Sequence, residues 1–345
     1  MSGLDLARRV RACTPAEFPD LALAVFEYQR QHNPTYRHWL ELTRKRDATP
    51  TSWRAIPCMP ISLFRTHDVR TGDWVAETSF SSSGTSGAQT SHHPVCSLVD
   101  YQDACVATFE EQYGPLAGYR LLALLPSYLE RTGSGLVAMV DAFIARAAAG
   151  SGYYLHDYAG LRQNIAEAGD RPVMLWGVSF ALLDLVAAGE LVLPKGSRVI
   201  ETGGMKGRRR ELTREELHRR LRRGLRDTDG LPIPIGSEYG MTEMSSQAYL
   251  DAQGRFRPAH TLRVQARELS DPYALRPAGK SGALNVYDLA NVHTASFLQT
   301  DDLGAVYEDG SFTVLGRADV ALARGCNLLY TDAADDAAPT ERRRA

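Results

Sequence analysis

Short apolar runs alternate with helical patterns through the middle of the chain, and this alternation constrains the fold more than any other feature. The runs are too short for helices and are bounded by charged or turn-forming residues. They are RLLALLPSYL (120–129), RPVMLWGVS (171–179), SRVIETGG (197–204) and LPIPIGSEYGMTE (231–243). Helical patterns, among them residues 135–149 and 180–191, stand between them. Buried strands alternating with helices predict an α/β fold with a mostly parallel sheet.

The two ends of the chain follow other patterns. Residues 1–47 are predicted to be helical with a break at Asn33-Pro34, residues 56–64 to be an extended loop, and residues 98–113 to be a helix. After about residue 258, short strands and a turn at Asp309-Gly310 predict an antiparallel, hairpin-rich subdomain. The final stretch, TDAADDAAPTERRRA, is predicted to be disordered because it is small, charged and non-periodic.

Composition excludes several classes of protein. The chain is 44% hydrophobic and 23% charged, as expected of a soluble globular protein. Its net charge of −2 gives no overall electrostatic field that would attract nucleic acid or a membrane surface. No apolar run approaches the roughly 20 residues of a membrane span, and no signal peptide is evident, so we expect a cytoplasmic protein. The five cysteines form no CxxC pair, which argues against a disulfide framework and a structural zinc site.

Two glycine-containing stretches have the composition of nucleotide-binding loops. FSSSGTSGAQTSHH (80–93) supplies hydroxyls and backbone N–H groups for phosphate oxygens, although it fits neither the Walker nor the GxGxxG pattern. A flexible linker has the same composition. ETGGMKG (201–207) places Gly-Gly after a strand, where a flat base can approach the backbone, but a plain turn is an alternative.

Two further stretches carry polar groups that suit a nucleotide. SEYGMTE (237–243) offers Tyr239 for stacking, the Thr242 hydroxyl, and the Glu243 carboxylate for Mg²⁺ beside a phosphate. LQTDDLG and GRAD place Asp302 and Arg317 where they could hold ribose hydroxyls. Each stretch also fits an ordinary turn or loop.

The order of these stretches resembles that of the adenylate-forming superfamily. Six segments narrow the resemblance to the bacterial acyl-protein synthetase family (LuxE-like). They are LLALLPSYLERTGSGLVAMV, LWGVSFALLDL, ETGGMKGRRREL, YGMTEMSSQAY, NVYDLAN and RGCNLLY. The resemblance runs to about Tyr330. It implies the large domain of that superfamily over residues 1–319, with mostly parallel sheets and a small antiparallel β-rich subdomain. A short stub, residues 320–345, is expected in place of the small C-terminal domain.

The family resemblance implies an activity and a set of site residues. ATP would activate a carboxylic acid, expected to be a fatty acid, to acyl-AMP with release of pyrophosphate. The acyl group would then pass to a cysteine thiol and to a partner such as an acyl reductase. The implied nucleotide-binding residues are Ser83, Gly84, Thr85, Ser86, Gly87, Gly203, Gly204, Met205, Tyr239, Gly240, Met241, Asp302 and Arg317. Thr242 and Glu243 would act at the α-phosphate, with Glu243 as the Mg²⁺ ligand. The sequence does not specify the acid, whose pocket is expected near residues 126–131 and 175–180.

Two departures from the superfamily pattern change the expected mechanism. The serine/glycine loop usually ends in Pro-Lys, and Gln89 and Thr90 stand there instead. His92 or His93 could replace the lysine, and His92 is our candidate, although a histidine without a catalytic role is the commoner case. Only 26 residues follow Asp319 and none is lysine, so the small domain and its catalytic lysine are expected to be absent.

Cys326, in ARGCNLLY, is our candidate acyl acceptor. It lies seven residues beyond Asp319, and Arg324 nearby would favour its thiolate. A buried structural cysteine is the alternative reading.

A basic run over residues 206–226 holds ten Lys/Arg against three Glu. Thr213 and Glu216 have capping-box spacing, and leucines at 217, 221 and 225 predict an amphipathic helix. Its basic face suits an acidic acyl reductase or acyl-carrier partner, or is simply solvated. Two other functions remain open: an acyl- or aryl-CoA ligase-like enzyme, and a non-catalytic acyl-adenylate-binding protein.

Overall fold

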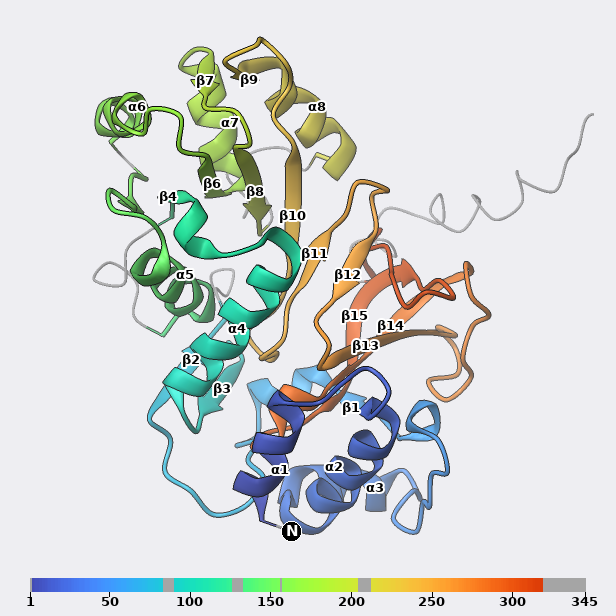
Figure 1. The fold of residues 1–345 in the computed structure, drawn as a ribbon. Coiled ribbons are helices and arrows are strands. Elements are labelled where there is room, and N and C mark those ends of the chain that lie inside the picture. Colours follow the sequence, from blue (N-terminus) through green and yellow to red (C-terminus); the bar gives the residue numbers. More distant parts are fainter. Residues whose placement is uncertain (1, 83–89, 126–132, 156, 204–211, 319–345) are drawn as a thin grey trace, which may run out of the picture.

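The computed structural model describes residues 2–82, 90–125, 133–155, 157–203 and 212–318 (Figure 1). Three helices, α1 (Gly3–Arg11), α2 (Phe18–His32) and α3 (Pro34–Leu42), pack together at the bottom of the view. Asn33 ends α2 and caps α3, because its side chain accepts a hydrogen bond of 2.9 Å from the Tyr36 N–H. The predicted helices and the break at Asn33-Pro34 are confirmed.

A seven-stranded sheet forms the centre of the fold, with the order β12-β11-β10-β8-β6-β4-β5. Its parallel strands are β4 (Arg120–Leu124), β5 (Gly152–Tyr153), β6 (Val173–Val178), β8 (Arg198–Thr202) and β10 (Ile235–Tyr239). Two antiparallel strands, β11 (Ala248–Leu250) and β12 (Phe256–Pro258), complete it. The mostly parallel α/β arrangement predicted from the apolar runs is therefore confirmed.

Helices cover both faces of this sheet. The Trp176 ring of β6 packs against Phe109 of α4 (Leu98–Tyr113) and Phe143 of α5 (Gly135–Arg146). On the other face, Gly177 lies against Leu182 of α7 (Ser179–Ala187), which in turn contacts α8 (Arg214–Gly224). The remaining elements at this end are α6 (Tyr158–Glu167) and the parallel pair β7 (Leu191–Leu193) and β9 (Leu225–Asp227). All six residues of β6 are buried because the strand is covered on both sides.

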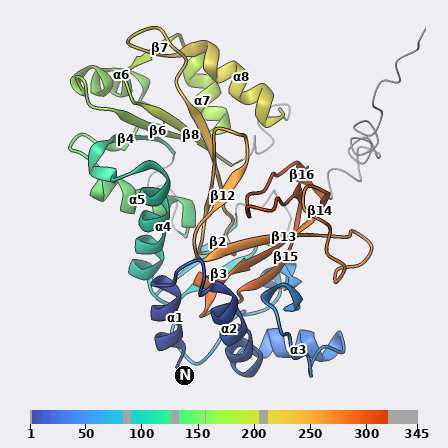
Figure 2. The same ribbon diagram turned by 45° about the vertical axis from the view of Figure 1, so that its right-hand side comes forward.

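A second sheet runs across the foot of β10–β12, as Figure 2 shows. It contains β13 (Leu262–Arg267), β14 (Ser281–Asp288), β15 (Phe297–Ala305) and β16 (Gly316–Arg317), which pair antiparallel as predicted. Rings of Tyr239, Phe256 and Phe312 pack between the two sheets, with centroids 5.2–5.6 Å apart. This aromatic contact brings the end of β10 close to β15.

The segment predicted as an extended loop is more regular than expected. β1 (Met59–Pro60) pairs parallel with β15, with Met59 opposite Leu298. Short 3-10 helices flank it, η1 (Trp53–Ala55) and η2 (Ile61–Arg65). The edge of β15 supplies backbone partners that a local pattern cannot reveal. The other short elements are the hairpin β2 (Thr78–Ser81) and β3 (His92–Val95), η3 (Leu116–Gly118) and η4 (Leu289–Asn291).

Two further expectations concern thiols and membranes. Cys13, Cys58 and Cys105 are buried, Cys96 is half-buried, and these four described cysteines carry free thiols. Across the described ranges no helix is long and apolar enough to cross a membrane.

Candidate active site at the strand ends

The carboxyl ends of β8 and β10 lie side by side and are joined by a side-chain hydrogen bond. The Thr202 hydroxyl donates to Glu238 Oε2 over 2.6 Å. Gly203 follows with φ of +70°, a left-handed conformation that favours glycine, and a β-carbon there would meet no atom of the described residues within 4 Å. The Ser179 hydroxyl donates to the Gly203 carbonyl oxygen over 2.6 Å. The Gly203 backbone is therefore held, and no described residue covers the side on which a β-carbon would stand, so that a flat group could approach there.

Tyr239 and Asp302 meet where the two sheets join. The buried Tyr239 phenol donates a hydrogen bond of 2.8 Å to Asp302 Oδ2. Burial, followed by the charge of Asp302, raises the pKa of Tyr239 well above its ordinary value, so the phenol stays a donor. Asp302 stands opposite Arg317 in the β15–β16 pair, and the Arg317 guanidinium donates to Asp301 over 3.0 Å. The structure thus brings three predicted nucleotide-binding residues together.

A buried histidine supports the loop after β10. His93 Nδ1 lies 2.7 Å from the Thr242 carbonyl oxygen, which can only accept, so Nδ1 carries the proton. Nε2 then accepts from the Thr294 hydroxyl, 3.1 Å away. Burial lowers the pKa of His93 to about 4, so the ring is neutral near pH 7. His92, our sequence candidate, is exposed on the other side of β3 and contacts the Thr90 hydroxyl, so any catalytic role of His92 remains a prediction.

Glu243 follows Thr242 and combines burial with an unpaired carboxylate. Its backbone carbonyl accepts from Asn291 Nδ2 over 2.8 Å. The residue is only 8% exposed. No hydrogen bond joins its carboxylate to a described residue, and its oxygens are not among the fully buried atoms without a partner, so they reach the surface. The next residues are clamped by the buried Asp288, which accepts from the N–H groups of Ser245 and Ser246 at 2.8 and 2.9 Å. Gly240 is exposed, and Met241 packs against both the N-terminal helices and the core between the sheets.

The described residues fit a magnesium ion that is shared with a substrate. They contain no cluster of three or more His, Cys, Asp or Glu side chains that could hold a metal on its own. Mg²⁺ is commonly held by one or two carboxylates together with substrate phosphates. The unpaired Glu243 carboxylate has the chemistry for that role.

Sequence reasoning missed two acidic residues within the strands. Glu201 of β8 is buried, and the Ser237 hydroxyl donates to its Oε1 over 2.5 Å, with His218 of α8 3.6 Å away. Glu238 of β10 has its pKa raised to about 7, mainly by desolvation and further by the charge of Glu201. The signal was present in VIETGG and GSEYG, since an acid inside an otherwise apolar strand needs a partner or a function.

Several predicted residues cannot be placed. The serine/glycine loop residues Ser83, Gly84, Thr85, Ser86 and Gly87, together with Gly204, Met205 and Cys326, lie outside the described residues. Their roles remain predictions. Within the basic run, α8 begins after Thr213, whose side chain caps the Glu216 N–H as predicted, and Leu217 and Leu221 are buried. The predicted helix is too long at its end, because α8 stops at Gly224 and Leu225 begins β9, which pairs with β7.

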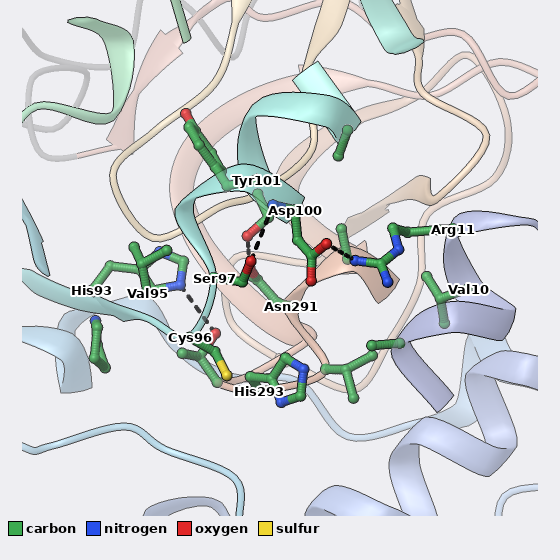
Figure 3. A pocket seen from close by; sticks show the side chains of 17 residues that line it. Val10, Arg11, His93, Val95, Cys96, Ser97, Asp100, Tyr101, Asn291 and His293 are labelled. Carbon is green, nitrogen blue, oxygen red and sulfur yellow. Dashed lines mark hydrogen bonds and ion pairs between the residues drawn. The ribbon is translucent and has the colours of Figure 1, made fainter. Parts of the chain in front are cut away.

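A small cavity adjoins the loop after β10 (Figure 3). Its volume is about 70 Å³, and it lies between α1, β3, α4 and η4. Figure 3 shows His93 on one side and His293 below, with an ion pair between Arg11 and Asp100 across it. The cavity shares His93 with the Thr242 contact, so it belongs to the surroundings of the candidate site.

Comparison with known proteins identifies the fold. No protein-family model matches this sequence, and no curated protein matches it. The solved structures that it resembles include O-succinylbenzoate coenzyme A synthetase (MenE) from Bacillus subtilis in complex with AMP. That match has a TM-score of 0.52 and 18% identity, and covers 71% of this chain and 50% of that chain. The chain has the large-domain fold of the adenylate-forming enzymes. The predicted fold class is confirmed.

Two further matches agree with this fold. The same synthetase in complex with ATP and magnesium gives a TM-score of 0.52 at 19% identity, over 71% of this chain and 50% of that chain. An ATP-bound chimera named RpMatB-BxBclM gives a TM-score of 0.50 at 18% identity. This match covers 72% of this chain and 50% of that chain. The chain spans about half the length of these proteins. Because identity is this low, the likeness concerns the fold, and the acyl-protein synthetase family stays a prediction.

Proposed function

We propose that this chain is an ATP-dependent ligase that activates a carboxylic acid as an acyl-adenylate. The observation that carries the proposal is the junction of Tyr239, Asp302 and Arg317, formed at the strand ends of an adenylate-forming fold. In support, the synthetase of this fold that was compared above is known in complex with AMP and in complex with ATP and magnesium. In the proposed reaction a carboxylate oxygen attacks the α-phosphorus, and pyrophosphate leaves.

The described residues suit separate parts of this reaction. Asp302 would accept from the ribose hydroxyls, with its carboxylate oriented by the Tyr239 phenol. The open side of Gly203 would receive the adenine. Thr242 and Glu243 would lie at the α-phosphate, where Mg²⁺ held by Glu243 offsets phosphate charge. The residues 83–87 would hold the remaining phosphates.

The second half-reaction is proposed to form a thioester on the protein. The thiolate of Cys326 would attack the acyl carbon, and AMP would leave. An acyl reductase or acyl-carrier partner would then take the acyl group. In support of docking, α8 buries Leu217 and Leu221 and presents four exposed arginines, Arg219, Arg220, Arg222 and Arg223. Such a face favours an acidic partner.

Exchange of labelled pyrophosphate into ATP tests the first half-reaction. We expect exchange that depends on a carboxylic acid, within a panel that includes the fatty acids implied by the family resemblance. Asp302→Ala should weaken exchange, whereas Glu308→Gln, an exposed change in the β15–β16 connection, should not. If no acid supports exchange, the ligase proposal fails and a non-catalytic adenylate-binding protein is favoured.

Mass spectrometry tests the acceptor. After incubation with ATP and an accepted acid, we expect a hydroxylamine-labile acyl group on the wild-type protein and on Cys96→Ser, but not on Cys326→Ser. A labile acyl group on Cys326→Ser would refute the acceptor assignment. If added coenzyme A is acylated instead, the enzyme is a CoA ligase.

A further inference from the structure

A second set of polar groups lies on the face of the seven-stranded sheet that α4 covers. Glu238 and Tyr249 are opposite each other in the β10–β11 pair, so their side chains emerge on the same face. The Tyr249 ring lies 6.1 Å from that of Phe109, which places this face under α4. Tyr239 points to the opposite face, towards Asp302.

This face holds hydrogen-bond acceptors that lack donors. The Gln247 Oε1 atom is buried with no hydrogen-bond partner, although its Nε2 donates to the Ser245 carbonyl over 3.2 Å. Glu238 accepts one hydrogen bond, from Thr202 on Oε2. Its other oxygen, Oε1, lies beside Gly240, where an added β-carbon would overlap it and would stand 3.7 Å from Gln247 Cγ. Gly240 therefore lies beside both Glu238 Oε1 and the Gln247 side chain.

No cation among the described residues neutralises Glu238. The titratable groups that interact with it are Glu201 of β8, Tyr101 and Cys105 of α4, and Tyr249 of β11. Each of these groups is neutral when protonated and negative when deprotonated, so none of them supplies positive charge to Glu238. The Tyr249 hydroxyl and the Trp176 indole N–H on the same face are also buried without partners, so these two donors do not reach Glu238 or Gln247 Oε1. The buried Gln247 amide oxygen and the half-buried Glu238 carboxylate would be satisfied by a group that brings hydrogen-bond donors and positive charge.

The position of these acceptors ties them to the proposed reaction. Glu238 directly precedes Tyr239, and Gly240 leads into Thr242 and Glu243, where the reacting carboxylate would lie. Gln247 follows the same loop, and Ser245 and Ser246 between them are held by Asp288. Glu238 and Gln247 thus stand at the two ends of the segment that carries Thr242 and Glu243. The rest of the acid would extend towards them.

We propose that the activated acid carries an amino group, and that its ammonium binds between the Glu238 carboxylate and the Gln247 amide oxygen. This inference rests on the proposed ligase function and names its substrate class. The proposed substrate therefore differs from the unsubstituted fatty acid that the sequence resemblance implies. Glu238 and Gln247 are then specificity-determining residues for the acid.

Matched acids test the substrate class. Pyrophosphate exchange is measured with sets of three acids that share a skeleton and end in ammonium, hydroxyl or methyl, such as 3-(aminomethyl)benzoate and its two analogues. The panel also contains α- and ω-amino acids with their deaminated forms. We expect at least one amino member to exceed both analogues in kcat/KM by on the order of a hundredfold, because the neutral analogues leave Glu238 unpaired.

Variants separate this inference from the ligase proposal. Glu238→Gln and Gln247→Met should each reduce the preference for the amino acid, whereas Glu308→Gln should keep it. Thermal unfolding of each variant, with and without the amino acid, shows whether it is folded and whether binding has been lost. The inference would be overturned if deaminated acids supported exchange with a kcat/KM equal to or higher than that of the amino acids, and if Glu238→Gln did not change these values. The ligase function would remain intact in that case. Absence of exchange with every acid would instead overturn the ligase function.

Discussion

The Tyr239 phenol and the Asp302 carboxylate, 63 positions apart in sequence, are joined by a hydrogen bond of 2.8 Å. This bond connects the central sheet with the second sheet at the proposed ribose site. It fixes the orientation of a carboxylate that is only partly buried. The nucleotide site therefore depends on how the two sheets pack against each other.

Removing the phenol tests this dependence. In Tyr239→Phe we expect the KM for ATP in pyrophosphate exchange to rise, while stability falls by about 1 kcal/mol, the usual net value of one hydrogen bond. Tyr273→Phe, which alters an exposed tyrosine, is the matched control. An unchanged KM for ATP would show that Tyr239 does not position Asp302 for the nucleotide.

Glu243 should control the magnesium dependence. Its carboxylate accepts no hydrogen bond from the described residues, so Glu243→Gln should leave the melting temperature close to that of the wild type. The magnesium concentration for half-maximal exchange should rise severalfold, because the amide is a poorer ligand than the carboxylate. Identical magnesium titrations for the variant and the wild type would exclude Glu243 as the ligand.

His93 should make stability fall in mild acid. Its pKa in the folded protein is about 4, below the ordinary value of 6.5, so between these values the unfolded chain binds a proton that the folded chain does not. This contribution is fully present above pH 6.5 and is lost as the pH falls towards 4. Urea unfolding at pH 7 and pH 5 should show wild type losing about 2 kcal/mol more than His93→Asn. Equal losses would mean that His93 is not held neutral in the fold.

Glu238 should impose a pH dependence on the choice of acid. Its pKa is raised to about 7, so the carboxylate that would bind an ammonium forms as the pH rises through 7. The kcat/KM for an amino acid should therefore increase with pH below about 7 and level off above it, because this constant reports the free enzyme. In Glu238→Gln this rise of kcat/KM with pH should disappear. A wild-type kcat/KM that does not change with pH around 7 would argue against an ionised Glu238 in the site.

The raised pKa of Glu238 also predicts how the Glu238→Gln substitution affects the stability of the fold. A carboxyl whose pKa is higher in the folded chain than in the unfolded chain weakens the fold as the pH rises between the two values. Glu238→Gln should therefore be at least as stable as the wild type at pH 8. A loss of amino acid preference in a variant of that stability could not be attributed to unfolding.

Local patterns in the sequence determined the secondary structure and the fold class. The periodicity of residues 98–113 predicted α4 over its full length, and the apolar runs predicted β4, β6, β8 and β10. These patterns are readable because burial on one or both faces of an element leaves a period in its own residues. The motifs YGMTE and LQTDDLG likewise indicated Tyr239, Thr242, Glu243 and Asp302.

Only the tertiary structure decided which side chains meet. Sheet register placed Glu238 beside Tyr249, and packing set His93 against Thr242, 149 positions away, while His92 faces outward. The pairing of β1 with β15 depends in the same way on a strand edge more than 200 positions distant. No local period carries such information, because register and sheet packing are fixed by contacts between segments far apart in the sequence.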